Sequence, residues 1–185
     1  MLEKVAARLW RVLNSAEIEF VIVGSVASSL AGEARTTQDV DILAVIRSEH
    51  IALLRTALSG SYYFDADSAE EALRSNRAFN IIALEGLLKF DFFPANDDFA
   101  LSQLSRKRFL TVPFLSADPI PVATAEDTIL AKLRWYVEGG SLSSRQWRDI
   151  EGIVRVQEER LDRKYLWNWA IRLGLEDLLE RLEIS

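Results

Sequence analysis

Two carboxylates stand two residues apart at the start of an apolar segment, and this pattern constrains the fold more than any other in the chain. They are Asp39 and Asp41, and the apolar run ILAVI follows at 42–46. Because alternate side chains of a strand share a face, Val40 can enter a core while both aspartates project from the other face. Two like charges this close are costly unless a basic side chain or a metal ion neutralises them. The pattern therefore predicts a strand with one apolar face and one acidic, cation-binding face.

Helical and strand patterns alternate around this strand. Apolar residues recur at helical spacing over 2–15, and a short helix is predicted over 25–32, ending at Gly32. Further helices are predicted over 48–58, 69–76 and 99–104. Strands are predicted over 20–24, 40–46, 79–84, 87–93 and 108–114. This alternation predicts an α/β fold of the α+β kind, with a mixed sheet flanked by helices.

From Pro119 onward the pattern changes to helices with clear capping residues. The predicted caps are Thr124 with Asp127, Ser143 with Gln146, and Asp162, and Gly139-Gly140 is a predicted stop. We therefore expect two units, an α/β domain over 1–118 and a C-terminal helical subdomain over 119–185. With 185 residues and 49% hydrophobic content, the chain can build a core plus a small helical appendage.

The segment before the acidic strand has the pattern of a phosphate-binding turn. Gly24-Ser25 ends one strand and opens a helix, which places free backbone N–H groups and a hydroxyl at a helix N-terminus. Asp39 and Asp41 follow on the next strand, and Asp91 lies on a later one. If the two acidic strands are neighbours, three carboxylates converge. Two metal ions about 4 Å apart on such carboxylates can clamp a triphosphate and activate an attacking hydroxyl.

Each part of this pattern has an ordinary structural explanation when it stands alone. A Gly-Ser turn is common, and a pair of aspartates in the D-x-D pattern often forms salt bridges or caps a strand. The order of strand, turn, helix, acidic strand and second acidic strand is what favours phosphoryl or nucleotidyl transfer.

The stretch 24–42, GSVASSLAGEARTTQDVDI, resembles the signature of the nucleotidyltransferase superfamily with a polymerase-β-like fold. The finer pattern is similar to a small bacterial group related to the AbiEii-type toxins of type IV toxin-antitoxin systems. It consists of Gly32, Arg35, Thr37, Asp39 and Asp41. The segments 126–135 and 145–153 resemble that group's helices, and the likeness covers most of residues 20–155.

The resemblance implies a role for each matching position. Asp39, Asp41 and Asp91 would be the catalytic residues and the magnesium ligands, with Asp91 helping to deprotonate the acceptor hydroxyl. The nucleotide would contact Gly24, Ser25, Arg35, Thr37, Lys132 and Asp149. Three of these have equally good structural interpretations: Lys132 as a solvated helix lysine, Arg35 as a surface ion-pair partner and Asp149 as a structural partner of nearby arginines.

The composition excludes several other kinds of chemistry. The absence of cysteine excludes a disulfide framework, a thiolate metal site and a cysteine nucleophile. The net charge of −6 gives no general attraction for RNA or another polyanion. The chain has neither a signal-peptide apolar region nor a run of about 18 apolar residues, so we expect a cytoplasmic protein. The single histidine, His50, is expected at an exposed helix start. The helical spacing of the aromatic residues Trp135, Tyr136, Trp147, Trp167 and Trp169 favours a core or an inter-helix seam, with a place for one of them in the nucleotide-base pocket as the alternative.

The favoured function is a Mg²⁺-dependent enzyme that transfers a nucleoside monophosphate from an NTP, ATP among them, to a hydroxyl of RNA, protein or a small molecule. Pyrophosphate would be the second product. One alternative treats D-x-D as the metal-nucleotide site of a glycosyltransferase, which the Gly-Ser turn and the short chain disfavour. Another is a non-catalytic interaction module or toxin-antitoxin component with a small antitoxin-like protein partner.

Overall fold

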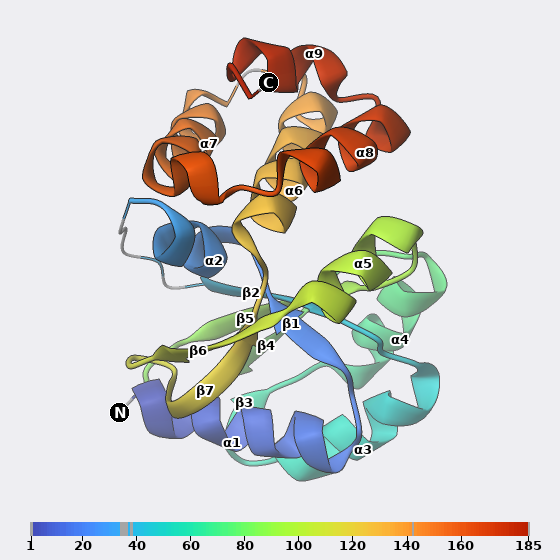
Figure 1. Ribbon diagram of the computed structural model, residues 1–185. Coiled ribbons are helices and arrows are strands. Elements are labelled where there is room, and N and C mark those ends of the chain that lie inside the picture. Colours follow the sequence, from blue (N-terminus) through green and yellow to red (C-terminus); the bar gives the residue numbers. More distant parts are fainter. Residues whose placement is uncertain (1, 34–36, 38, 142, 185) are drawn as a thin grey trace.

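The computed structural model of the chain describes residues 2–33, 37, 39–141 and 143–184 (Figure 1). The strands in this part form one seven-stranded mixed sheet. They are β1 Phe20–Ile22, β2 Asp39–Ala44, β3 Tyr62–Tyr63, β4 Phe79–Ala83, β5 Lys89–Pro94, β6 Arg108–Val112 and β7 Ser116–Val122. The helices are α1 Leu2–Ser15, α2 Gly24–Ala31, α3 Ser48–Leu58, α4 Ala66–Arg74, α5 Asp98–Arg106, α6 Ala125–Glu138, α7 Ser144–Gln157, the 3₁₀ turn Glu158–Arg160, α8 Arg163–Leu173 and α9 Glu176–Arg181.

The two acidic strands are neighbours at the centre of the sheet. The strand order is β3-β4-β5-β2-β1-β7-β6. Strand β2 pairs parallel with β5 and antiparallel with β1, and β1 pairs parallel with β7. The Gly24-Ser25 turn therefore leaves the strand directly beside Asp39 and Asp41.

The apolar face of β2 and β5 packs on α1. Val40, Ile42, Phe90 and Phe92 are fully buried, and the ring of Trp10 on α1 meets the ring of Phe90 edge-on at 5.6 Å. Figure 1 shows α1 and α3 below the sheet, with α2, α5 and the C-terminal helices above it. Since side chains alternate along a strand, the aspartates project toward the α2 side, as the sequence predicts.

The C-terminal helices form their own apolar cluster on top of α2 and α5. This cluster joins Leu133 of α6, Ile153 of α7 and Leu166 of α8 to Ala31 of α2 and Phe99 of α5. The predicted caps are present: Thr124, Ser143 and Asp162 each accept a hydrogen bond from the backbone N–H three residues on. We still propose an α/β domain followed by a helical subdomain. The predicted boundary at residue 118 lies inside strand β7, which ends at Val122.

Strand β7 was not predicted, because its sequence contains Pro119 and Pro121. The N–H of Ala123, directly after β7, donates to the carbonyl of Ile22 in β1. Because successive backbone N–H groups of a strand point to opposite sides, the backbone nitrogens of the odd-numbered residues of β7 also face β1. The missing N–H groups of the two prolines thus face β1, which pairs with β7 only at Val122. The ladder to β6 uses the other side of the strand, and this explains how two prolines are tolerated here.

Two smaller expectations also differ from the structure. The short strand β3 was not predicted, and His50 is buried rather than exposed, at 5% exposure. Its Nδ1 accepts a hydrogen bond from the backbone N–H of Arg47, which caps the start of α3. In the described part of the chain, no helix is long and apolar enough to cross a bilayer.

Candidate active site

The turn at Gly24-Ser25 packs directly against the carboxylate of Asp41. Gly24 has a left-handed φ of +60°, and a Cβ atom at this position would lie 1.9 Å from Oδ2 of Asp41. The backbone N–H of Ser25 donates to that same oxygen over 3.3 Å. Only glycine combines this φ with so close an approach. The start of α2 and the acidic strand are therefore held in contact by backbone geometry.

The pairing of β2 with β5 brings the three predicted carboxylates to one face. Asp41 is the direct register partner of Asp91, and Asp39 is the partner of Lys89. The condition for the three carboxylates to share one face, that these two strands are neighbours, is met. The described residues nevertheless contain no group of three or more acidic or histidine side chains that is close enough to hold a metal ion.

A lysine lies among these carboxylates. The Nζ atom of Lys89 is 2.7 Å from Oδ2 of Asp91. The sequence pattern left open whether a basic side chain or a metal ion neutralises the acidic face, and in this structure Lys89 contacts one of its three carboxylates. Lys89 was missed as a site residue, although the K-F-D pattern at 89–91 has the same period of two as Asp39-Val40-Asp41.

The charges of this face shift two pKa values. Burial raises the pKa of Asp41 above its ordinary value, and the charges of Asp91 and Asp39 raise it further, against the opposing effects of the Ser25 N–H and of Lys132. The hydrogen bond to Asp91 raises the pKa of Lys89, and Asp39 and Asp41 act in the same direction. The face thus favours a positive charge beside it, and Asp41 binds a proton more readily than an ordinary aspartate does.

Lys132 and Asp149 form an ion pair beside the carboxylates. Lys132 lies on α6 and Asp149 on α7, and Nζ is 2.9 Å from Oδ2. Both side chains are largely buried, with 12% and 18% exposure, so Lys132 is not a solvated surface lysine. Its charge is close enough to lower the pKa of Asp41. The structure therefore brings Lys132 to the acidic face and pairs it with the other polar residue predicted from the helical segment.

The segment that leads into β2 contains the remaining predicted positions. The hydroxyl of Thr37 donates to the carbonyl of Asp39 over 2.9 Å, which stabilises the start of the strand. Arg35 lies outside the described residues. Gly32 ends α2 against α7, where an added Cβ would lie 2.9 Å from the backbone N of Ile153. Gly32 therefore has a packing role at the contact with the helical subdomain.

The acidic face has further neighbours. Asn80 of β4 is the register partner of Asp91 and is exposed. Phe93 lies two residues beyond Asp91, and its ring meets that of Trp135 edge-on at 5.9 Å. Trp135 is 52% exposed, so the expected position in a core or an inter-helix seam is wrong for this residue, whereas Trp169 is buried as expected.

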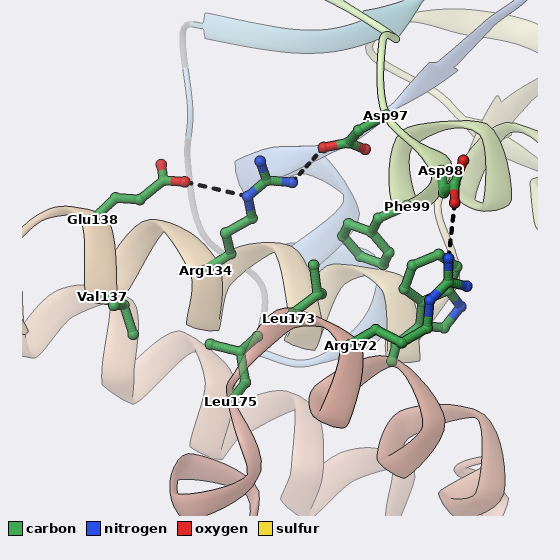
Figure 2. Close-up of a pocket in the computed structure, with 10 residues that line it drawn as sticks. Asp97, Asp98, Phe99, Arg134, Val137, Glu138, Arg172, Leu173 and Leu175 are labelled. Carbon is green, nitrogen blue, oxygen red and sulfur yellow. Dashed lines mark hydrogen bonds and ion pairs between the residues drawn. The ribbon is translucent and has the colours of Figure 1, made fainter.

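A separate cavity lies between α5, α6 and α8. It has a volume of about 660 Å³ and is crossed by the ion pairs Arg134–Asp97 and Arg172–Asp98 (Figure 2). Among the described residues that line it, none is a predicted site residue. The acidic face of the sheet and this cavity are therefore distinct features of the molecule.

Known proteins match this chain in fold but not in sequence. No protein-family model matches the chain, and no curated protein is similar to it in sequence. A nucleotidyltransferase-like antigenic protein from Paracoccidioides brasiliensis superposes with a TM-score of 0.55 at 16% identity, over 100% of this chain and 93% of that one. The fold is that of a nucleotidyltransferase.

An antibiotic-resistance factor, ANT(2″)-Ia, has the same architecture. Its solution structure superposes with a TM-score of 0.54 at 10% identity, over 96% of both chains. Its crystal structure in complex with adenylyl-2″-tobramycin gives 0.52 at 12% identity, over 92% of this chain and 95% of that one. At these identities the likeness concerns the fold.

Proposed function

We propose that this chain is a Mg²⁺-dependent nucleotidyltransferase, which transfers a nucleoside monophosphate from an NTP to a hydroxyl acceptor and releases pyrophosphate. One observation carries the proposal: the Gly24 backbone lies against the carboxylate of Asp41, and Asp41 is in register with Asp91. A helix N-terminus for phosphates and carboxylates for metal ions thus meet at one place, on a nucleotidyltransferase fold.

The carboxylates have the chemistry that magnesium requires. Asp39 and Asp41 offer hard oxygen ligands on one face of β2, and Asp91 offers a third from β5. Bound there, magnesium would neutralise the triphosphate and make the acceptor hydroxyl more acidic. Asp91 is furthest from the phosphate turn in the strand order, so we assign it to the acceptor side, where it positions the hydroxyl and takes up its proton.

The remaining predicted residues would bind the nucleotide. The backbone N–H of Gly24 would donate to phosphate oxygens at the N-terminus of α2, and the N–H of Ser25 would do so in exchange for its hydrogen bond to Asp41. Lys132 would neutralise the triphosphate and would be held in place by Asp149, its partner at 2.9 Å. We keep Arg35 and Thr37 as proposed nucleotide contacts because they precede the metal-binding strand.

The acceptor is proposed as a class rather than as a compound. ANT(2″)-Ia is described with adenylyl-2″-tobramycin, so a hydroxylated small molecule is one candidate. RNA is disfavoured by the net charge of −6. The likeness to AbiEii-type toxins rests on the motif residues, and it makes a protein or RNA acceptor in a toxin-antitoxin setting the other candidate.

A second candidate function is a non-catalytic module that keeps the fold for an antitoxin-like protein partner. The observation in its favour is that two lysines already neutralise the site, through the pairs Lys89–Asp91 and Lys132–Asp149. A site with its charges paired internally needs no metal ion for stability. Binding of magnesium and NTP separates this candidate from the enzyme.

A transfer assay tests the proposed function. The protein is incubated with magnesium, a cell extract and each NTP labelled at the α-phosphate, and RNA, protein and small molecules are then separated. We expect label in one of these fractions, at least about a thousandfold less of it with Asp41→Asn, and an undiminished amount with the matched variant Asp67→Asn, which alters an exposed aspartate of α4. Equal labelling by the Asp41 and Asp67 variants, or no labelling with any NTP, would refute it.

A further inference from the structure

The acidic face contains one basic side chain, Lys89, that competes with cations from solution for a carboxylate. Nζ of Lys89 is 2.7 Å from Oδ2 of Asp91, which is the distance of a strong charge-assisted hydrogen bond. On the neighbouring strand, Lys89 is also the register partner of Asp39. The ammonium group thus contacts Asp91 and is close enough to Asp39 and Asp41 for their charges to act on it.

Lys89 lies on the acidic face because side chains alternate between the two faces of β5, and it makes no contribution to the apolar core. Phe90 and Phe92 fill the apolar face completely, and Lys89 and Asp91 are left on the other face. Their side chains are 37% and 19% exposed, so solvent and ions reach the pair. An ion pair of this kind is weak enough to be exchanged for a stronger cation.

A divalent cation that binds Oδ2 of Asp91 competes with the ammonium group for the same oxygen atom. Magnesium binds carboxylate oxygens at about 2.1 Å with strict octahedral geometry. An ammonium nitrogen at 2.7 Å from Oδ2 occupies the space on that side of Asp91.

We propose that Lys89 is the resident counter-ion of the acidic face, and that it must release Oδ2 of Asp91 before a divalent cation can bind that atom. This inference rests on the proposed function, because it concerns the same carboxylates. Lys89 stabilises the metal-free protein by neutralising Asp91, and for the same reason it weakens metal binding on the acceptor side. The metal ion that Asp91 binds is therefore held more weakly than one bound by Asp39 and Asp41 with the nucleotide.

The test is a titration of the metal-free protein with Mn²⁺ alone, followed by the EPR signal of free Mn²⁺. We expect Lys89→Met to bind Mn²⁺ about fivefold more tightly, the factor that corresponds to the upper range of a partly exposed ion pair. Lys89→Gln should give the same gain, and it keeps a polar side chain in case the methionine variant folds poorly. The matched control is Lys107→Met, which breaks a pair with Glu19 elsewhere and removes the same charge; its Mn²⁺ affinity should stay within about twofold.

A double-mutant cycle with Asp91→Asn separates displacement from a general charge effect. If Lys89 blocks Asp91, the gain from Lys89→Met disappears once Asp91 has lost its charge. An equal gain in both backgrounds would mean that removing any nearby positive charge suffices, and it would overturn the inference. Unchanged affinity in Lys89→Met, or no Mn²⁺ binding by any variant, would overturn it as well.

The outcome is independent of transfer, because the titration contains neither nucleotide nor acceptor. A protein that shows the fivefold gain and transfers no nucleotide would end the proposed function and leave this inference standing. A protein that transfers nucleotide but shows no gain in Lys89→Met would end this inference and leave the proposed function standing.

Discussion

Replacing Gly24 by alanine tests the contact on which the candidate site is built. A left-handed φ costs a non-glycine residue about 1 kcal/mol. The new Cβ would also lie 1.9 Å from Oδ2 of Asp41, so the carboxylate must move and the hydrogen bond from the Ser25 N–H is lost. Hydrogen bonds to charged groups contribute about 1.5–3 kcal/mol. We therefore expect Gly24→Ala to lower the free energy of unfolding by about 2.5–4 kcal/mol.

Urea denaturation of the metal-free protein at pH 7 measures this loss, and the chain offers a matched control. Gly60 also has a positive φ, +74°, but no atom lies within 4 Å of the place that a Cβ atom would occupy there. Gly60→Ala should thus cost only the backbone term of about 1 kcal/mol. In a background of Asp41→Gly, which also removes the Asp41 Cβ atom that would lie 2.8 Å from the new one, the cost of Gly24→Ala should fall toward the same value. Equal costs for the two alanine variants in the wild-type background would refute the contact.

Three further predictions concern the carboxylates. Replacing Asp39 or Asp41 by Asn should lower transfer about a thousandfold or more, because a metal ligand is lost without loss of packing. Circular dichroism should show an intact fold, and unfolded variants would instead point to a structural pair. Asp91→Asn should keep most affinity for Mg²⁺ and NTP in calorimetry but lose turnover, since the acceptor hydroxyl is no longer activated; wild-type turnover would contradict its role. Because burial and neighbouring charges raise the pKa of Asp41, the folded protein binds its proton more tightly than the unfolded chain does. Metal-free Asp41→Asn should therefore be more stable than the wild type at pH 7, and melting curves should show this advantage shrinking as the pH falls through the raised pKa toward 3.8; an advantage that does not change with pH would contradict the shift.

The period of two in β2 and β5 made the acidic face predictable from sequence. Val40, Phe90 and Phe92 must enter the core, and this forces Asp39, Asp41 and Asp91 onto the opposite face. The register between the two strands is a different matter, because it depends on how the whole sheet assembles. Sequence patterns therefore predicted which face the aspartates occupy, while only the structure shows that Asp41 lies directly beside Asp91.

Side-chain pairing across the sheet could not be predicted in the same way. Lys89 obeys the same alternation as Asp91, yet whether its ammonium group turns to Asp91, to Asp39 or to solvent depends on distances in three dimensions. Lys132 and Asp149 come from different helices, and their pairing depends on how α6 packs on α7. Local signals, such as the capping hydroxyl of Thr124, depend only on neighbours in sequence and were predicted correctly.

Strand β7 and Trp135 show where local rules mislead. Proline at positions 119 and 121 argues against a strand, but β1 is short and leaves their missing N–H groups without a required partner. Trp135 has helical spacing with buried residues, yet it projects toward Phe93 at the edge of the acidic face and is half exposed. In both cases the neighbouring element decides the outcome.

The most direct test of the central claim is the melting temperature of the protein with magnesium and each NTP, separately and together. If the start of α2 and the acidic face bind a metal–nucleotide complex, the pair should stabilise the fold far more than either component does. At a hundredfold excess over the dissociation constant, the gain is about 2.7 kcal/mol, or roughly 5–10 °C for a chain of this size. Asp41→Asn should lose this shift. An unchanged melting temperature with saturating magnesium and every NTP would contradict the account.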